Sequence, residues 1–226
     1  MFIGHYAPAA ALKPLSPSVP LWHYFVAVQF LDYLWAAFIL TGVEHARIVP
    51  GFIEASDLDL YHMPYTHSLA AAAAWSLIGA AAYRRLVNPK AGASGAMLIG
   101  AAIFSHWLAD LVVHASDLAL YPGSSVKLGF GLWSLLTFSK GVELGLFLAG
   151  FILYLGGTSA RGVVGRVAPF IVIAALIGVE LYSATGAPPA DIRTFAFLAL
   201  VSYTAIAAIA AWLDAVRSPK RADRRP

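Results

Sequence analysis

The sequence SHWLADLVVH, residues 105–114, places three potential ligand side chains at four-residue intervals within otherwise apolar sequence. In a helix, each four-residue step turns about 400°, so His106, Asp110 and His114 drift only about 40° per step and form one polar stripe. Such a stripe is costly in an apolar environment unless its members are paired or bind a metal. This stretch therefore predicts a helix that carries a polar face into an apolar environment.

The composition of the chain identifies that environment as a membrane. Of its 226 residues, 60% are hydrophobic and only 12% are charged, and the mean hydropathy is +0.73. These values are typical of a polytopic membrane protein and lie far from the average of soluble proteins. The chain has no cysteine, so a bound metal would depend on His, Asp and Glu. No basic segment with a small-residue cleavage site begins the chain, and we expect no cleaved signal peptide.

The apolar segments predict an all-α, polytopic membrane bundle of about six transmembrane helices. The expected spans are residues 22–43, 66–83, 94–114, 131–155, 163–184 and 193–216. Residues 1–12 are apolar but too short to cross a membrane, and they predict a re-entrant or interfacial segment. Residues 44–65 are expected to form a loop, and residues 117–129 a turn-rich connector without regular structure. The chain would then be one transmembrane domain, residues 1–216, followed by a basic tail, residues 217–226.

Basic residues gather on one side of this six-helix arrangement, whereas the opposite loops carry mainly acids. The basic residues are Arg84, Arg85, Lys90, Arg161, Arg166, Arg217, Lys220, Arg221, Arg224 and Arg225. By the positive-inside rule, we expect both termini in the cytoplasm. The net charge of +3 then reflects orientation and attraction to anionic lipid, and we expect no nucleic-acid partner.

This topology puts polar side chains of several helices in the outer half of the membrane. His62, His67 and His114 are expected toward the outer face, and His106 roughly 12 Å below His114. Asp32 is expected roughly 15 to 18 Å below the outer end of its span. Because the ions of a two-metal site lie only about 3.5 to 4 Å apart, helix tilt or a loop that enters the membrane must bring Asp32, His67 and His106 together.

Histidine and carboxylate side chains from several helices suit a divalent metal, zinc first and manganese second, with a position open to water. Such an ion lowers the pKa of bound water toward about 7 and supplies hydroxide for attack on an ester or phosphodiester. A second ion would stabilise the leaving oxygen. The spacing therefore predicts a hydrolytic metal site with one or two ions.

The sequence also resembles a known family at these residues. An early Asp, a Thr-His-Ser-Leu that opens one apolar helix and a Ser-His-x-x-x-Asp on the next are similar to bacterial inner-membrane proteins described as metal-dependent hydrolases, which are distantly similar to zinc-dependent phospholipase C. The matching positions are Asp32, His67, His106 and Asp110. The likeness covers the first three spans and, more loosely, residues 4–5 and 120–123. It implies a metal site and a lipid-like or phosphoester substrate.

The chain departs from the secreted phospholipases in lacking a recognisable second set of ligands. The remaining candidates for metal binding are His5, His62 and His114. A carboxylate, either Asp110 or Glu143, is the candidate general base.

Other interpretations of the same polar residues remain open. They suit a proton- or ion-coupled transporter or channel, although no internal repeat supports that function. They also suit a non-catalytic accessory subunit of a larger membrane complex, with histidines that bind a pigment or haem. The purely structural alternatives are a buried pair between His106 and Asp110 and a pair between Asp32 and Lys140.

Overall fold

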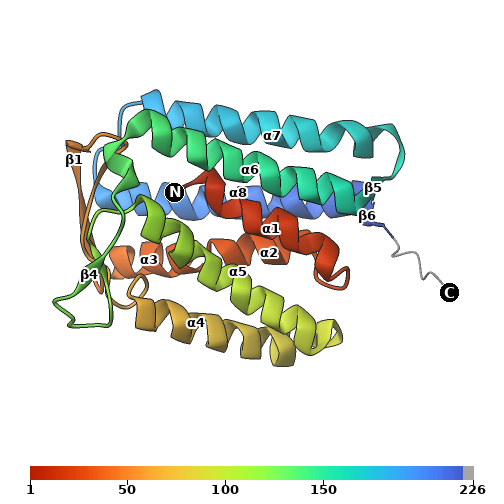
Figure 1. The fold of residues 1–226 in the computed structure, drawn as a ribbon, viewed down its shortest axis with the longest axis horizontal. Coiled ribbons are helices and arrows are strands. Elements are labelled where there is room, and N and C mark those ends of the chain that lie inside the picture. The colour runs from red at the N-terminus through yellow and green to blue at the C-terminus, as the bar shows by residue number, and fades with distance from the viewer. Residues whose placement is uncertain (221–226) are drawn as a thin grey trace.

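The computed structural model of the protein describes residues 1–220, which form a bundle of helices that run along one common direction (Figure 1). The helices are α1 (Tyr6–Leu12), α2 (Leu21–Val28), α3 (Phe30–Thr41), α4 (Leu69–Ala82), α5 (Gly92–Val113), α6 (Leu136–Gly157), α7 (Gly162–Thr185) and α8 (Ile192–Val216). The strands are β1 (His45–Ile53), β2 (Ser56–His62), β3 (Leu118–Ala119), β4 (Lys127–Leu128), β5 (Thr158–Ala160) and β6 (Arg217–Pro219). The mainly helical architecture predicted from the sequence is therefore confirmed, with short strands in addition.

The number of membrane spans differs from the predicted six. Within residues 1–220, four helical segments are long and apolar enough to cross a membrane: Pro89–Val113, which contains α5, and the helices α6, α7 and α8. The pair α2 and α3 adds a fifth if it counts as one span. The span predicted at 66–83 contains α4, which has only 14 residues because it starts at Leu69 and gives way to a π-helical turn at Tyr83–Val87. Six spans stay a prediction.

The span predicted at 22–43 is broken at Gln29, where α2 and α3 meet at an angle of 52°. In an unbroken helix, the carbonyl of Val28 would accept a hydrogen bond from the N–H of Asp32. The break leaves that carbonyl free for another donor. It also puts Asp32 in the first turn of α3, where the helix dipole favours a carboxylate.

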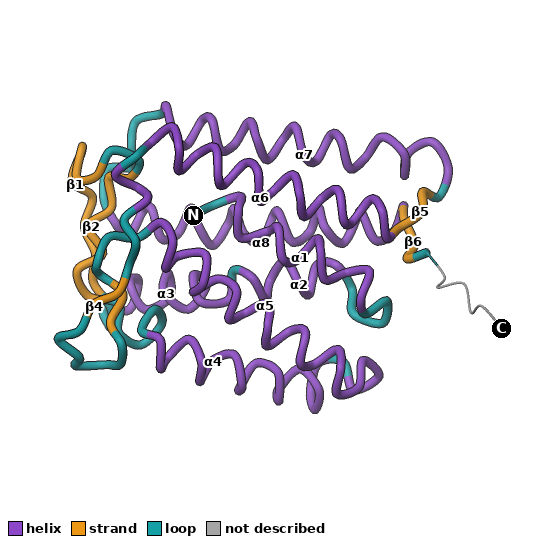
Figure 2. Tube along the Cα trace, viewed as in Figure 1, coloured by secondary structure: helices purple, strands orange, loops and turns teal. Residues whose placement is uncertain are grey.

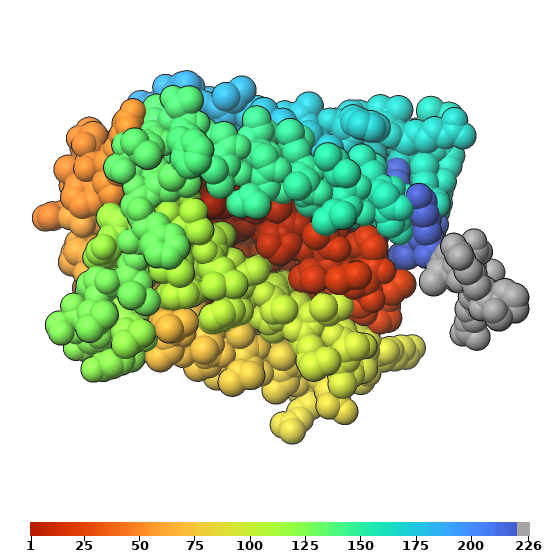
Figure 3. All heavy atoms as spheres, in the orientation of Figure 1, coloured from red at the N-terminus to blue at the C-terminus, as the bar shows by residue number. Residues whose placement is uncertain are grey.

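The short α1 fills the space between α5 and α6, where its surface is visible in Figure 3. Tyr6, Ala9 and Ala10 are buried against the neighbouring helices. Gly150 of α6 permits this close approach, because a Cβ atom there would lie 2.4 Å from the carbonyl oxygen of Ala7. Of the two positions predicted for residues 1–12, the packing agrees with a segment folded into the bundle and not with one lying at the membrane surface.

The loop predicted at 44–65 is instead a β-hairpin of β1 and β2 at one end of the bundle (Figure 2). Arg47 lies opposite Asp59 in the hairpin and forms an ion pair with it at 2.7 Å. The connector at 117–129 likewise contains a short antiparallel pair, β3 with β4. Cross-strand pairing organises both segments, so the prediction of irregular structure was wrong for them.

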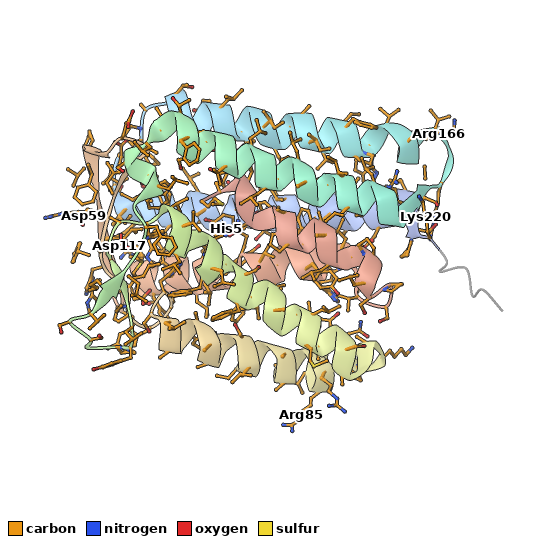
Figure 4. The ribbon with its side chains drawn as sticks, viewed as in Figure 1. His5, Asp59, Arg85, Asp117, Arg166 and Lys220 are labelled. Carbon is orange, nitrogen blue, oxygen red and sulfur yellow. The ribbon has the colours of Figure 1, made fainter. Side chains whose placement is uncertain are left out.

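Charge is distributed unequally between the two ends of the bundle (Figure 4). Asp59 and Asp117 lie at the hairpin end, and Arg85, Arg166 and Lys220 lie at the opposite, basic end. Arg217 belongs to β6, not to a free tail, and its buried guanidinium donates to Thr158 and Gly165. The predicted tail residues Arg221, Arg224 and Arg225 lie outside the described residues.

Candidate metal centre

Four of the predicted ligands meet at one point inside the bundle. Asp32 comes from the first turn of α3, His67 from the turn before α4, and His106 and Asp110 from α5. The Nε2 atom of His67 lies 3.4 Å from Asp32 Oδ1 and 3.6 Å from Asp110 Oδ2. The Nε2 atom of His106 lies 3.5 Å and 3.1 Å from the same two oxygens, and the two Nε2 atoms are 3.4 Å apart. We call these residues the four-residue cluster.

The difference in depth expected between His67 and its partners is absent. His67 precedes α4, and its backbone carbonyl accepts a hydrogen bond from the indole N–H of Trp107 at 2.9 Å. The turn that carries His67 is thereby fastened to α5, one residue from His106. A non-helical segment that packs against the bundle interior brings the predicted ligands together.

The distances within the four-residue cluster match those between ligands of one tetrahedral ion. Zinc holds nitrogen and oxygen ligands at about 2.0 to 2.1 Å, which separates tetrahedral ligand atoms by about 3.3 to 3.4 Å. The five pairs that include a histidine nitrogen range from 3.1 to 3.6 Å. Five of the six distances among the four ligand atoms are therefore close to the spacing that such an ion requires.

The tautomer of His106 follows from the break between α2 and α3. Its Nδ1 atom lies 2.7 Å from the carbonyl oxygen of Val28, which the break has released from its helical partner. A carbonyl oxygen only accepts hydrogen bonds, so Nδ1 carries the proton. In the neutral ring, Nε2 then presents its lone pair to the cluster.

A chain of hydrogen bonds sets the tautomer of His67 in the same way. The Thr66 hydroxyl lies 2.7 Å from Glu44 Oε2 and 2.7 Å from His67 Nδ1. Since a carboxylate only accepts, Thr66 donates its single proton to Glu44 and accepts the Nδ1 proton of His67. Glu44 is fully buried, and its Oε1 atom also accepts from the backbone N–H groups of Tyr65 and Thr66. The Nε2 lone pair of His67 is left facing the cluster.

Two imidazole lone pairs and two carboxylates thus face one another where little water reaches. His67, His106 and Asp110 are buried, and only Asp32 is partly open, with 19% of its side chain exposed. Acceptors that converge in this way repel one another unless a cation lies between them. Either a metal ion or a proton on one imidazole satisfies that requirement.

Three contributors to this arrangement were missed in the sequence. Glu44 and the Thr66 hydroxyl orient His67, and the hydroxyl of Tyr203 donates to Asp32 Oδ2 at 2.9 Å from α8. Tyr203 could have been found from the sequence, because a tyrosine hydroxyl in the middle of an apolar helix needs a polar partner. No spacing rule connects Glu44 with Thr66, because the contact depends on how the hairpin folds back.

The other oxygen of Asp110 faces a second group of nitrogens. Its Oδ1 atom lies 3.1 Å from His5 Nε2, 3.6 Å from His114 Nε2 and 3.3 Å from the amino nitrogen of Met1. His5, labelled in Figure 4, is buried in the bundle, and its ring stacks on that of His106 with centroids 3.8 Å apart. Two further predicted ligands therefore lie beside the four-residue cluster.

His62 and Glu143 lie in different surroundings. His62 is exposed on β2 and stacks against His45 of β1. Glu143 accepts hydrogen bonds from the backbone N–H groups of Phe2 and Gly4, so it fastens the N-terminal segment to α6. Lys140, which the sequence offered as a partner of Asp32, lies instead beside Glu143 and Glu180. That structural alternative for Asp32 was wrong.

Comparison with curated proteins gives no match, and neither does comparison with solved structures. A family model described as YdjM inner membrane protein matches residues 23–187, which include the four-residue cluster but not His5. Together with the apolar helices, this match supports a multi-pass protein of the bacterial inner membrane. It carries no information on hydrolysis or on likeness to phospholipase C, and both stay predictions. The chain belongs to the YdjM inner membrane protein family.

Proposed function

We propose that the protein is a membrane-embedded metallohydrolase whose four-residue cluster binds a divalent ion, zinc in preference to manganese. The observation that carries this proposal is the convergence of two imidazole lone pairs and two carboxylates, in which every pair that includes a histidine nitrogen is 3.1 to 3.6 Å apart. The Val28 carbonyl and the Thr66 hydroxyl support it, because they fix both histidines in the ligating tautomer.

Held by Asp32, His67, His106 and Asp110, such an ion would supply hydroxide formed from water near neutral pH. That hydroxide would add to the phosphorus or carbonyl carbon of an ester, the ester bond to the leaving oxygen would break, and that oxygen would take up a proton. In this assignment Asp110 is a ligand and Glu143 an anchor of the N-terminal segment, so neither serves as general base.

A lipid-like substrate is favoured by an apolar groove whose lining includes Tyr33, the residue after Asp32. The groove has a volume of about 420 Å³ and is lined by Trp22, Val26, Tyr33, Thr204, Ala207, Ala208 and Ala211, from α2, α3 and α8. Its Tyr33 ring packs 5.5 Å from the ring of Tyr203, which holds Asp32. Since Asp32 is the most exposed ligand of the cluster, an acyl chain in the groove would bring its head group to the open side of the site.

Metal analysis of the purified protein tests this proposal. Elemental analysis should find bound zinc or manganese in the wild type and none in the double variant His106→Ala, Asp110→Ala. His62→Ala is the matched control, because it removes a histidine that lies outside the cluster. A folded wild type without metal would contradict the proposal, as would equal loss of metal in the control. Hydrolysis of phospholipid and diester substrates should fall with the metal content.

A second candidate function, ion-coupled transport, is favoured by the broken span formed by α2 and α3. Broken helices whose ends face polar groups form the ion sites of many transporters. Among residues 1–220 this is the one such bent pair. Proton flux in proteoliposomes that persists without bound metal and disappears in Asp32→Asn would favour transport over hydrolysis.

A further inference from the structure

Asp110 lies between two groups of nitrogen atoms that approach different oxygens of its carboxylate. Its Oδ2 atom faces His67 and His106, whereas its Oδ1 atom faces His5 and His114. A carboxylate in this position can bridge two cations, with one oxygen on each.

The tautomer of His114 is set by Asp117. The Nδ1 atom of His114 lies 2.9 Å from Asp117 Oδ1, a carboxylate oxygen that only accepts, so Nδ1 carries the proton. The lone pair of Nε2 is then left 3.6 Å from Asp110 Oδ1, which is also an acceptor. Both side chains are buried. Two buried acceptors that face each other need a cation between them. The Met1 amino group lies 3.3 Å from the same oxygen and is one such cation, so a metal ion bound here would take its place.

The stacking of His5 on His106 sets the spacing between the two groups. The rings are nearly parallel, with an angle of 7° between their planes and 3.8 Å between their centroids. The Nε2 atom of each ring lies 3.1 Å from one oxygen of Asp110. Cations bound to these two nitrogens would be separated by about the stacking distance, and the ions of two-metal hydrolases lie about 3.5 to 4 Å apart.

We infer that Asp110 bridges two divalent ions, the first in the four-residue cluster and the second held by Asp110 Oδ1, His5 and His114. This inference rests on the proposed function and favours phosphoesters within its substrate class. Two ions at this spacing stabilise both the attacking and the leaving oxygen of an in-line displacement at phosphorus. The hydroxide oxygen bonds to phosphorus, the phosphorus–oxygen bond to the leaving alcohol breaks, and the alkoxide takes a proton from water.

Metal stoichiometry in the full-length protein tests the inference. After dialysis against zinc and removal of free metal, the wild type should hold two ions per chain, and His5→Ala and His114→Gln one each. Asp117→Asn should weaken the second ion about 10- to 100-fold, because it removes the acceptor that orients His114. His45→Ala, on the exposed hairpin, is the matched control and should keep both ions.

A spectroscopic readout distinguishes two sites from one without an activity measurement. With manganese in place of zinc, the wild type should give the electron paramagnetic resonance spectrum of a spin-coupled pair, and His114→Gln that of an isolated ion. A wild type with one ion, unchanged in the His5 and His114 variants, would overturn the second site and leave the proposed function standing. A wild type with no ion would overturn both. Circular dichroism and size-exclusion chromatography identify variants that fail to fold. If His5→Ala or His114→Gln fails to fold, the metal content of Asp117→Asn tests the second site in their place.

Discussion

At the scale of single residues, the orientation of His67 depends on one hydroxyl group. Thr66→Val keeps the shape of the side chain but removes the link between His67 and Glu44. We expect zinc affinity, measured by competition with a chelator, to fall about 10- to 100-fold. The buried Glu44 Oε2 and His67 Nδ1 atoms would lose a partner, which should lower the free energy of unfolding by about 1 to 3 kcal/mol.

Thr41→Val is the control for this substitution. The Thr41 hydroxyl donates to the Ala37 carbonyl of its own helix and is exposed, so its removal should leave zinc affinity unchanged. Equal affinity in Thr66→Val and the wild type would show that the hydroxyl does not orient His67.

Sequence predicts ligands that share a helix better than ligands that folding brings together. His106 and Asp110 could be paired from their spacing of four residues, because helix geometry alone puts them on one face. The positions of Asp32 and His67 beside them depended on a helix break and on a turn before α4. Tyr203 contacts Asp32 across 171 residues of sequence, a distance at which periodicity carries no information.

At the scale of helices and strands, the apolar pattern predicted α5 to α8 closely but not the break within the first span. The sequence around Gln29 contains neither proline nor glycine, the usual causes of a kink. The hydrogen bond from His106 to the freed Val28 carbonyl compensates for the lost helical bond. Because that compensation comes from another helix, the local sequence could not reveal it.

The packing of α1 on α6 leads to a prediction at the same scale. In Gly150→Val, the new side chain would meet the backbone of Ala7, since even a Cβ atom would lie 2.4 Å from its carbonyl oxygen and 2.6 Å from its Cα atom. We expect α1 to shift and carry His5 with it. Thermal unfolding in detergent should reveal a loss of about 1 to 3 kcal/mol, and the second metal ion should bind more weakly than the first.

Gly145→Ala is the matched control in the same helix, because a Cβ atom there meets nothing within 4 Å. It should unfold like the wild type and keep its metal content. If Gly150→Val also behaved like the wild type, the close contact between α1 and α6 would not be needed to position His5.

At the scale of the whole molecule, the composition predicted a membrane protein. A chain with 60% hydrophobic and only 12% charged residues has too few charged side chains to cover its apolar surface in water. The number of spans was less predictable. The apolar pattern of a segment such as 66–83 does not indicate whether the whole segment is helical or part of it is a turn. In the structure, α4 has only 14 residues. The hairpin was missed because pairing between its strands, and not their individual pattern, stabilises it.

The uneven distribution of charge leads to the prediction of orientation. The basic end, with Arg85, should face the cytoplasm, and the hairpin end, with Tyr61, the periplasm. Because the chain has no cysteine, Tyr61→Cys and Arg85→Cys each provide a single exposed thiol. In cells with a permeabilised outer membrane, an impermeant maleimide should label the first variant at once and the second only after lysis. Labelling of Arg85→Cys before lysis would show that the orientation is opposite to the predicted one. The metal centre lies next to the turn after the hairpin, so its ions and substrate would then come from the cytoplasm.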